Sequence, residues 1–383
     1  MNNKRLVSLD LLRGLDIFIL TVACGIVHGI DGVWKLPDWY MRQFLHPEWV
    51  GFSGHDLIMP LFIFMAGAAL PLALPKRLNA DGTAGWKYWK HVLSRVALLW
   101  FWGMVTQGCL FSFDPTQISY FNNTLQTIAV GYIITAAVAR IPSRKVRIAF
   151  PFALAALYTV LLHSLGDMTP TGNFAVVYET KLLKLFYPEN LWNSLCITQI
   201  ADWHYTWWTT IPMFGVMALA GYHATEIVLS ERTGLQKTGL LASVGLGLLA
   251  LGAVLLTFDP CVKHIFTASF TSFAMGCSFL FYAGCYYIAD VKMWRRGYEI
   301  ILLFGRFSLM AYLLADVFYG PIGHLARVFL SNGRFDLVHG FVRFFSEGVA
   351  NLLIVLASSV ILCGLLALRS EWQRRGAACK ESK

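Results

Sequence analysis

The sequence predicts an all-α polytopic membrane protein with about ten transmembrane helices and both termini in the cytoplasm. Hydrophobic residues make up 57% of the 383 residues and charged residues only 14%, whereas a soluble domain carries about a quarter charged residues. The mean hydropathy is +0.57. Apolar runs such as 238–256 and 351–368 are long enough to cross a hydrocarbon core, which takes about 20 residues of helix.

Hydropathy divides the chain into ten predicted helices. We expect residues 1–383 to form a single transmembrane domain, in which the outer loops 31–55 and 166–203 form a vestibule for a substrate. The predicted helices are 8–30, 56–75, 91–111, 122–140, 147–165, 204–229, 238–257, 264–289, 299–319 and 342–368.

The amino terminus looks at first like a secretory signal peptide, because Lys4 and Arg5 precede an apolar run. Asp10, Arg13 and Asp16 interrupt that run, however, and no small-residue cleavage site follows it. We therefore expect the first span to be retained.

The distribution of basic residues predicts the orientation. Of the 31 Lys and Arg residues, 21 fall on the side that holds both termini, eight on the other side, and two inside spans. Cytoplasmic loops carry the excess of basic residues, so both termini are predicted inside. Because the net charge of +9 is spread over these short connections, nucleic-acid binding is not indicated.

Cysteine usage indicates no metal or disulfide framework. The eight cysteines are scattered singly, without a C-x-x-C pair. Cys196 and Cys261 share the predicted outer side, but two unrelated thiols are the favoured interpretation.

A polar segment leads directly into the second predicted helix, on the outer side. It contains His46, Glu48, His55 and Asp56. Ionisable groups at a bilayer boundary cost free energy, so such a cluster is a candidate functional site.

The residue types in this segment suit acid–base chemistry. His46 is the candidate catalytic residue, because an imidazole near neutrality can accept a proton from an amine or act as a nucleophile. Asp56 could orient that imidazole, as the acid of a catalytic triad does. Trp49 suits packing against a sugar ring, and His55 is a candidate acceptor contact. The alternative is an interfacial belt, where Trp and polar residues gather without catalysis.

A second constellation opens the first helix on the cytoplasmic side. Asp10 and Arg13 lie one turn apart on one face, and Ser8 is placed to cap the helix. Arg13 could bind an anionic ligand bidentately, because its planar guanidinium matches phosphate geometry. An internal Asp10–Arg13 ion pair is an equally good interpretation.

A third group lies at the start of the eighth predicted helix, on the outer side. Lys263 and His264 follow Asp259-Pro260 there. Lys263 could bind a substrate oxygen or could extend to the membrane interface without a partner.

These patterns together resemble the heparan-α-glucosaminide N-acetyltransferase family and its bacterial relatives. The resemblance covers most of the chain, and the block from His46 to Gly67 is its most specific part. The matching positions are Ser8, Asp10, Arg13, Gly14, His46, Trp49, Gly51, Asp56, Leu57, Pro60, Phe62, Phe64, Gly67, Leu125, Gln126, Ile128, Thr209, Ile211, Pro212, Lys263, Ser269 and Phe270. The chain differs from the relatives at Cys24, Thr127 and Phe307.

The resemblance implies an acyltransferase. Such an enzyme moves an acetyl group from cytosolic acetyl-CoA, its co-substrate, to an amino sugar or glycan at the outer face. It implies that His46 is the general base or nucleophile, and that Arg13 and Asp10 lie near the CoA phosphates. We expect a bacterial inner membrane as the location and no metal.

Two other functions fit the sequence. A transporter of sugars or sugar derivatives would use the same polar residues as a permeation path, and a binding or assembly protein would use them without catalysis. Glycines at 245, 252, 276 and 284 permit close helix packing and a possible homodimer.

Overall fold

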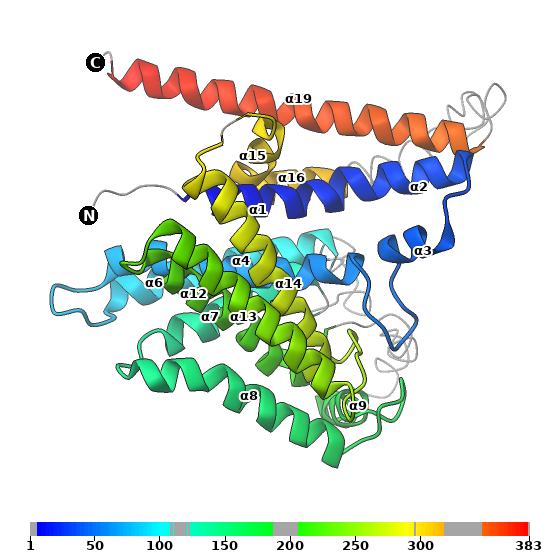
Figure 1. Cartoon of the computed structure of the whole chain (residues 1–383), viewed down its shortest axis with the longest axis vertical. Helices are drawn as coiled ribbons and strands as arrows, with labels where there is room; N and C mark the ends of the chain where they lie inside the picture. Colours follow the sequence, from blue (N-terminus) through cyan, green and yellow to red (C-terminus); the bar gives the residue numbers. More distant parts are fainter. Residues whose placement is uncertain are drawn as a thin grey trace. The chain divides into compact units, whose positions relative to one another are not determined.

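Each of the ten segments predicted from hydropathy contains a helix (Figure 1). A computed structural model describes residues 6–107, 110, 121, 123–186, 206–294, 296–317 and 347–381. The helices are α1 (Val7–Phe18), α2 (Cys24–Val33), α3 (Asp38–Met41), α4 (Ile58–Ala68), α5 (Leu70–Ala73), α6 (Trp86–Thr106), α7 (Thr124–Val138), α8 (Arg144–Ser164), α9 (Phe174–Phe186), α12 (Ile211–Leu229), α13 (Gly234–Leu255), α14 (Ala268–Tyr286), α15 (Glu299–Arg306), α16 (Ser308–Val317) and α19 (Glu347–Glu381).

The helical membrane protein predicted from the sequence is confirmed. In the described part of the chain, seven helical runs are long and apolar enough to cross a membrane: Val7–Val33, His55–Ala73, Arg144–Ser164, Trp208–Leu229, Gly234–Leu255, Ala268–Val291 and Val355–Gln373. The helix Thr124–Val138 is apolar but shorter. Ten spans and two cytoplasmic termini stay predictions.

Several helix boundaries differ from the prediction, and the predicted outer loop 166–203 contains the helix α9. Three of the differences at the boundaries have a physical reason. α6 begins at Trp86, before the predicted start at residue 91. The lysines in its first turns lower the local hydropathy, which hid these turns from the prediction, but they do not break the helix. α19 continues past the predicted end at residue 368 to Glu381. Charged residues lower the hydropathy of these last turns without breaking the helix. The predicted helix 299–319 is two helices, since Phe307 adopts a non-helical backbone (φ −116°, ψ 31°) between α15 and α16. Part of the predicted vestibule, 187–203, lies outside the described residues.

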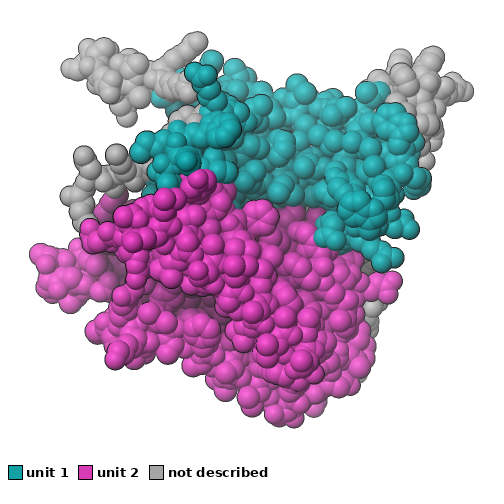
Figure 2. Space-filling model, in the orientation of Figure 1, with its two compact units in different colours: residues 1–45, 288–383 teal, residues 46–287 magenta. Residues whose placement is uncertain are grey.

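The described chain divides into two compact units (Figure 2). Unit 1 contains residues 1–45 and 288–383, and unit 2 contains residues 46–287. The polar segment that begins at His46 belongs to unit 2, and the Asp10–Arg13 pair belongs to unit 1.

In unit 1, α1 packs closely against α15. A Cβ at Gly14 would overlap the Ile301 carbonyl, and a Cβ at Gly305 would overlap the Asp10 carbonyl. The predicted Ser8 cap is wrong, because the helix begins at Val7 with Leu6 at its N-cap. The Ser8 backbone N–H instead donates to Asp290 Oδ2 at 3.0 Å.

In unit 2, α4 and α12 form the centre of the packing. Both are apolar around most of their circumference, and α4 is buried along nearly its whole length. A Cβ at Gly67 would overlap the Ala218 carbonyl, and one at Gly221 would overlap the Phe64 carbonyl. Small residues of this kind let helix backbones approach closely in a membrane. The position of α4, which begins at the candidate site, therefore depends on this contact.

Replacing Gly67 with Ala is expected to destabilise unit 2. The added methyl group meets backbone atoms that cannot rotate away, and overpacking of this kind costs about 1–3 kcal/mol. Thermal unfolding of the purified protein in detergent measures the loss. Gly247→Ala in α13 is the matched control, because no atom lies within 4 Å of its Cβ position. Equal melting temperatures for the two variants would contradict the packing.

Candidate functional site

The site is built around a histidine–carboxylate pair at the start of α4. His46 Nδ1 lies 2.6 Å from Asp56 Oδ1. The His46 side chain is 46% exposed, whereas the Asp56 side chain, in the 3-10 turn His55–Leu57, is fully buried. A carboxylate only accepts hydrogen bonds, so Nδ1 donates to it. In the neutral imidazole, Nε2 then keeps its lone pair.

Ser53 holds the other oxygen of the same carboxylate. Its backbone N–H and its hydroxyl each donate to Asp56 Oδ2 at 3.0 Å. The Asp56 backbone N–H donates back to the Ser53 carbonyl at 3.2 Å and closes a turn. The carboxylate is therefore fixed in one orientation, as the acid of a catalytic triad must be.

Lys263 completes the cluster from the connection between α13 and α14. Its Nζ lies 3.2 Å from Asp56 Oδ1, and 3.1 Å and 3.4 Å from Nδ1 and Nε2 of His46. Burial lowers the pKa of the Lys263 ammonium, and the Asp56 carboxylate opposes part of that shift. The sequence alone gave Lys263 only a weak signal, yet it contacts both members of the pair.

Backbone contacts tie this connection to the segment that follows His46. The Gly51 N–H donates to the Cys261 carbonyl at 2.8 Å, and Val50 forms an isolated antiparallel bridge with Val262. Gly51 has φ of 150°, and a Cβ there would crowd Pro47. Glycine is required at this position because other residues disfavour that conformation.

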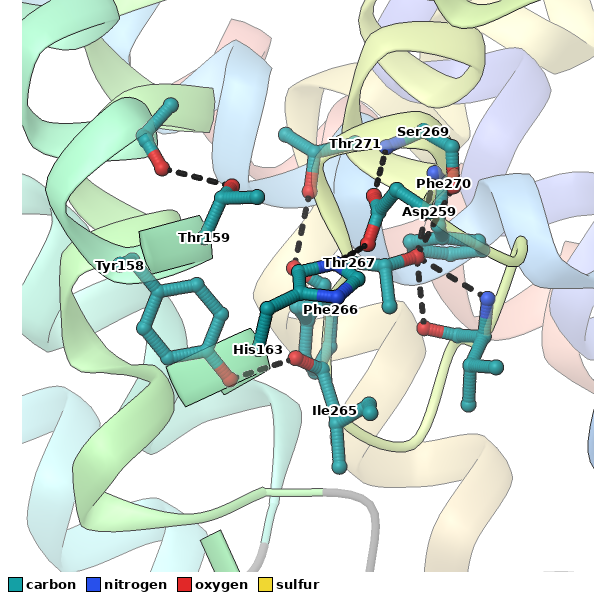
Figure 3. A network of polar contacts seen from close by, with 12 residues as sticks. Tyr158, Thr159, His163, Asp259, Ile265, Phe266, Thr267, Ser269, Phe270 and Thr271 are labelled. Atoms are coloured by element: carbon teal, nitrogen blue, oxygen red, sulfur yellow. Dashed lines mark hydrogen bonds and ion pairs between the residues drawn. The ribbon is translucent and has the colours of Figure 1, made fainter. Parts of the chain in front are cut away.

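A second polar network anchors the same connection from α8 (Figure 3). His163 Nε2 lies 2.9 Å from Asp259 Oδ1, and Asp259 Oδ2 accepts from the Ser269 N–H at 2.8 Å. The Tyr158 hydroxyl donates to the Ile265 carbonyl at 2.7 Å. These bonds join α8 to the start of α14.

Thr267 ties the two ends of the connection together (Figure 3). Its Oγ1 accepts from the Val262 N–H at 3.0 Å and from the Phe270 N–H at 3.4 Å, so it also caps α14. Phe266 has φ of 46°, a conformation uncommon for a bulky residue. The position of Lys263 is therefore fixed by contacts on both sides of it.

Aromatic side chains form one wall of the site. Trp49 stacks on His264 with ring centroids 5.3 Å apart and an angle of 18°. The Trp49 Nε1–H donates to the Met168 carbonyl at 2.7 Å. Burial and the charge of Lys263 lower the pKa of His264. Sugar packing against Trp49 stays a prediction.

His55 lies at the edge of the His46 ring. The two ring centroids are 4.5 Å apart, in a T-shaped arrangement. His55 is half-buried, so its predicted contact with an acceptor also stays a prediction.

Cys261 is a free, buried thiol. Burial raises its pKa to about 12, so it is protonated at neutral pH and is not a competing nucleophile. Cys196, its conceivable partner, lies outside the described residues.

The Asp10 and Arg13 side chains, predicted on the cytoplasmic side, form an ion pair in unit 1. Arg13 Nη1 lies 3.4 Å from Asp10 Oδ1, with side chains 24% and 11% exposed. The sequence allowed two interpretations of these residues, an internal ion pair and a site for an anion, and the ion pair is the contact that is present. CoA binding by Arg13 and Asp10 stays a prediction.

Sequence reasoning missed several residues of the site. The Ser53-x-x-Asp56 spacing of a side-chain-stabilised turn was an available signal for Ser53. The pairing of His163 with Asp259 joins residues 96 positions apart, and no local pattern indicates it. Within the described ranges, no group of three or more His, Cys, Asp or Glu side chains is arranged to hold a metal ion.

Comparison with known proteins adds one match. The profile of a family described as a domain of unknown function, DUF5009, matches residues 5–126. That stretch includes the Asp10–Arg13 pair, the His46–Asp56 pair and all of α4. No curated protein sequence matches the chain. The match covers about a third of the chain, and the matched residues include both the Asp10–Arg13 pair and the His46–Asp56 pair.

Proposed function

We propose that the protein is a transmembrane acyltransferase that moves an acetyl group from cytosolic acetyl-CoA to an amino sugar or glycan. Transfer takes place at the outer face of a bacterial inner membrane, in a chain with about ten spans and both termini inside. One observation carries the proposal: His46 donates from Nδ1 to the buried Asp56 carboxylate at 2.6 Å while its side chain is 46% exposed. That arrangement supplies an accessible, oriented base.

In the proposed reaction His46 acts as general base. The acceptor amine attacks the thioester carbonyl carbon, and its proton passes to His46 Nε2. The C–S bond then breaks, and the CoA thiolate takes the proton from the imidazolium, which leaves an amide and CoA thiol. Asp56 stabilises the imidazolium between these two steps.

Substituting His46 or Asp56 is expected to abolish most of the transfer. Loss of a general base costs about 10² to 10⁴-fold in rate. His46→Ala and Asp56→Asn should each lower kcat by this range in an assay with labelled acetyl-CoA and a glucosamine acceptor. His91→Ala in α6 is the matched control. Unchanged kcat in His46→Ala would rule out the proposed role.

The same assay without acceptor separates direct transfer from a two-step route. Label trapped on the parent protein and absent from His46→Ala would show that His46 carries the acetyl group itself. No trapped label, together with transfer when acceptor is added, is the result expected for the direct route.

Removing the charge of Lys263 is expected to destabilise unit 2. The ammonium lies 3.2 Å from the buried Asp56 carboxylate, and removal of one partner from a buried ion pair costs about 3–5 kcal/mol. Thermal unfolding of Lys263→Met in detergent, compared with the parent, measures the loss. An unchanged melting temperature would contradict the ion pair.

Binding of CoA tests the cytoplasmic constellation. CoA should raise the melting temperature of the parent protein, and Arg13→Ala should weaken the shift because a guanidinium–phosphate contact is lost. Arg42→Ala, on the predicted outer side, is the control. Sugar counterflow in vesicles without CoA, combined with no CoA shift, would favour the transporter instead.

A further inference from the structure

An apolar groove with a volume of about 730 Å³ lies in unit 2, between α8, α12, α13 and α14. His46, Asp56 and Lys263 do not line it. Aliphatic side chains form most of its wall, including Ala155. Along α8 the groove runs from Arg144 to Val160, which corresponds to about 24 Å of helix at 1.5 Å per residue.

The groove is bordered by helices that face the bilayer. Only 17% of the apolar window of α8, and likewise of α13, is buried inside the protein. A ligand with a long hydrocarbon chain could therefore enter sideways from the membrane.

One end of the groove is polar and contains an unusual backbone contact. Pro151 lies inside α8 and has no N–H, so the carbonyl of Arg147, four residues earlier, loses its helical partner. His223 of α12 supplies a replacement, because its Nε2 lies 3.1 Å from the Arg147 carbonyl oxygen. His223 Nδ1 lies 2.8 Å from Glu226 Oε2.

Arginine side chains make the polar end basic. Both nitrogens of His223 face acceptor oxygens. Arg147 Nη2 lies 3.6 Å from Glu226 Oε1, so the Glu226 carboxylate faces two partners, Arg147 and His223. Arg144 and Arg232 also line this end, and they leave an excess of positive charge.

We infer that the groove binds an anionic phospholipid of the surrounding bilayer. Its acyl chain lies along α8 and α12, and its phosphate lies between Arg144 and Arg232. The charge excess selects an anionic headgroup over a zwitterionic one, because a basic residue near an anionic lipid contributes about fivefold in affinity. The apolar wall excludes a nucleotide or a free sugar as the occupant. The inference does not depend on acyl transfer.

Lipid titration followed by native mass spectrometry tests the headgroup assignment. The purified protein in neutral detergent should bind phosphatidylglycerol more tightly than phosphatidylcholine. Arg144→Ala and Arg232→Ala should each weaken phosphatidylglycerol binding about fivefold, and the double variant should lose the preference. Lys145→Ala is the control, because Lys145 is exposed beside Arg144 and does not line the groove.

A variant with a bulky side chain in the groove tests where the acyl chain of the lipid lies. Ala155→Phe places a ring inside the groove and should abolish tight binding of both lipids. Ala153→Phe, two residues away on the same helix and outside the lining, should not.

Three results would overturn the proposal. Equal affinity of the parent for the two lipids, or a loss in the arginine variants no larger than in Lys145→Ala, excludes the headgroup site. Equal lipid binding by Ala155→Phe and Ala153→Phe places the lipid elsewhere on the protein.

Discussion

The buried carboxylate of Asp56 is the constraint on which the candidate site depends. An ionised carboxylate without partners in a protein interior costs several kcal/mol, and removal of one partner from a buried ion pair costs about 3–5 kcal/mol. His46, Lys263 and the turn at Ser53 meet this requirement together. The segment before α4 and the connection before α14 must therefore stay in contact for unit 2 to be stable. The orientation of the His46 ring is a product of the same requirement.

The connection that carries Lys263 is held from both sides. The bridge between Val50 and Val262 joins it to the His46 segment, and the His163–Asp259 pair joins it to α8. A histidine paired with a fully buried aspartate occurs at both places. In the first pair the histidine is accessible beside a lysine, whereas the second pair lies in a network of backbone contacts. Identical residue types thus form the proposed reactive pair in one place and an anchoring pair in the other.

The sequence was sufficient for the class of fold and for the centre of the site. Helices in membranes must be apolar over a fixed length, so hydropathy placed a helix in each of the ten predicted segments. It missed α9, a helix in the predicted outer loop 166–203 that is too short to cross a membrane. His46 and Asp56 lie ten positions apart, close enough for one segment and one turn to bring them together. Lys263 lies 217 positions from His46, and its proximity depends on packing that no local pattern encodes. The break at Phe307 had no Pro or Gly at that position to indicate it.

Pro151 and His223 have a consequence for how this chain tolerates change. In most helices a proline leaves an unsatisfied carbonyl, but here an imidazole from a neighbouring helix replaces the missing amide. The identities of the two residues are therefore coupled: a residue with an amide at position 151 would compete with His223 for the Arg147 carbonyl. Without the imidazole, the proline would leave that oxygen without this hydrogen-bond partner. The contact therefore couples α12 to α8 through a backbone carbonyl as well as through side-chain packing.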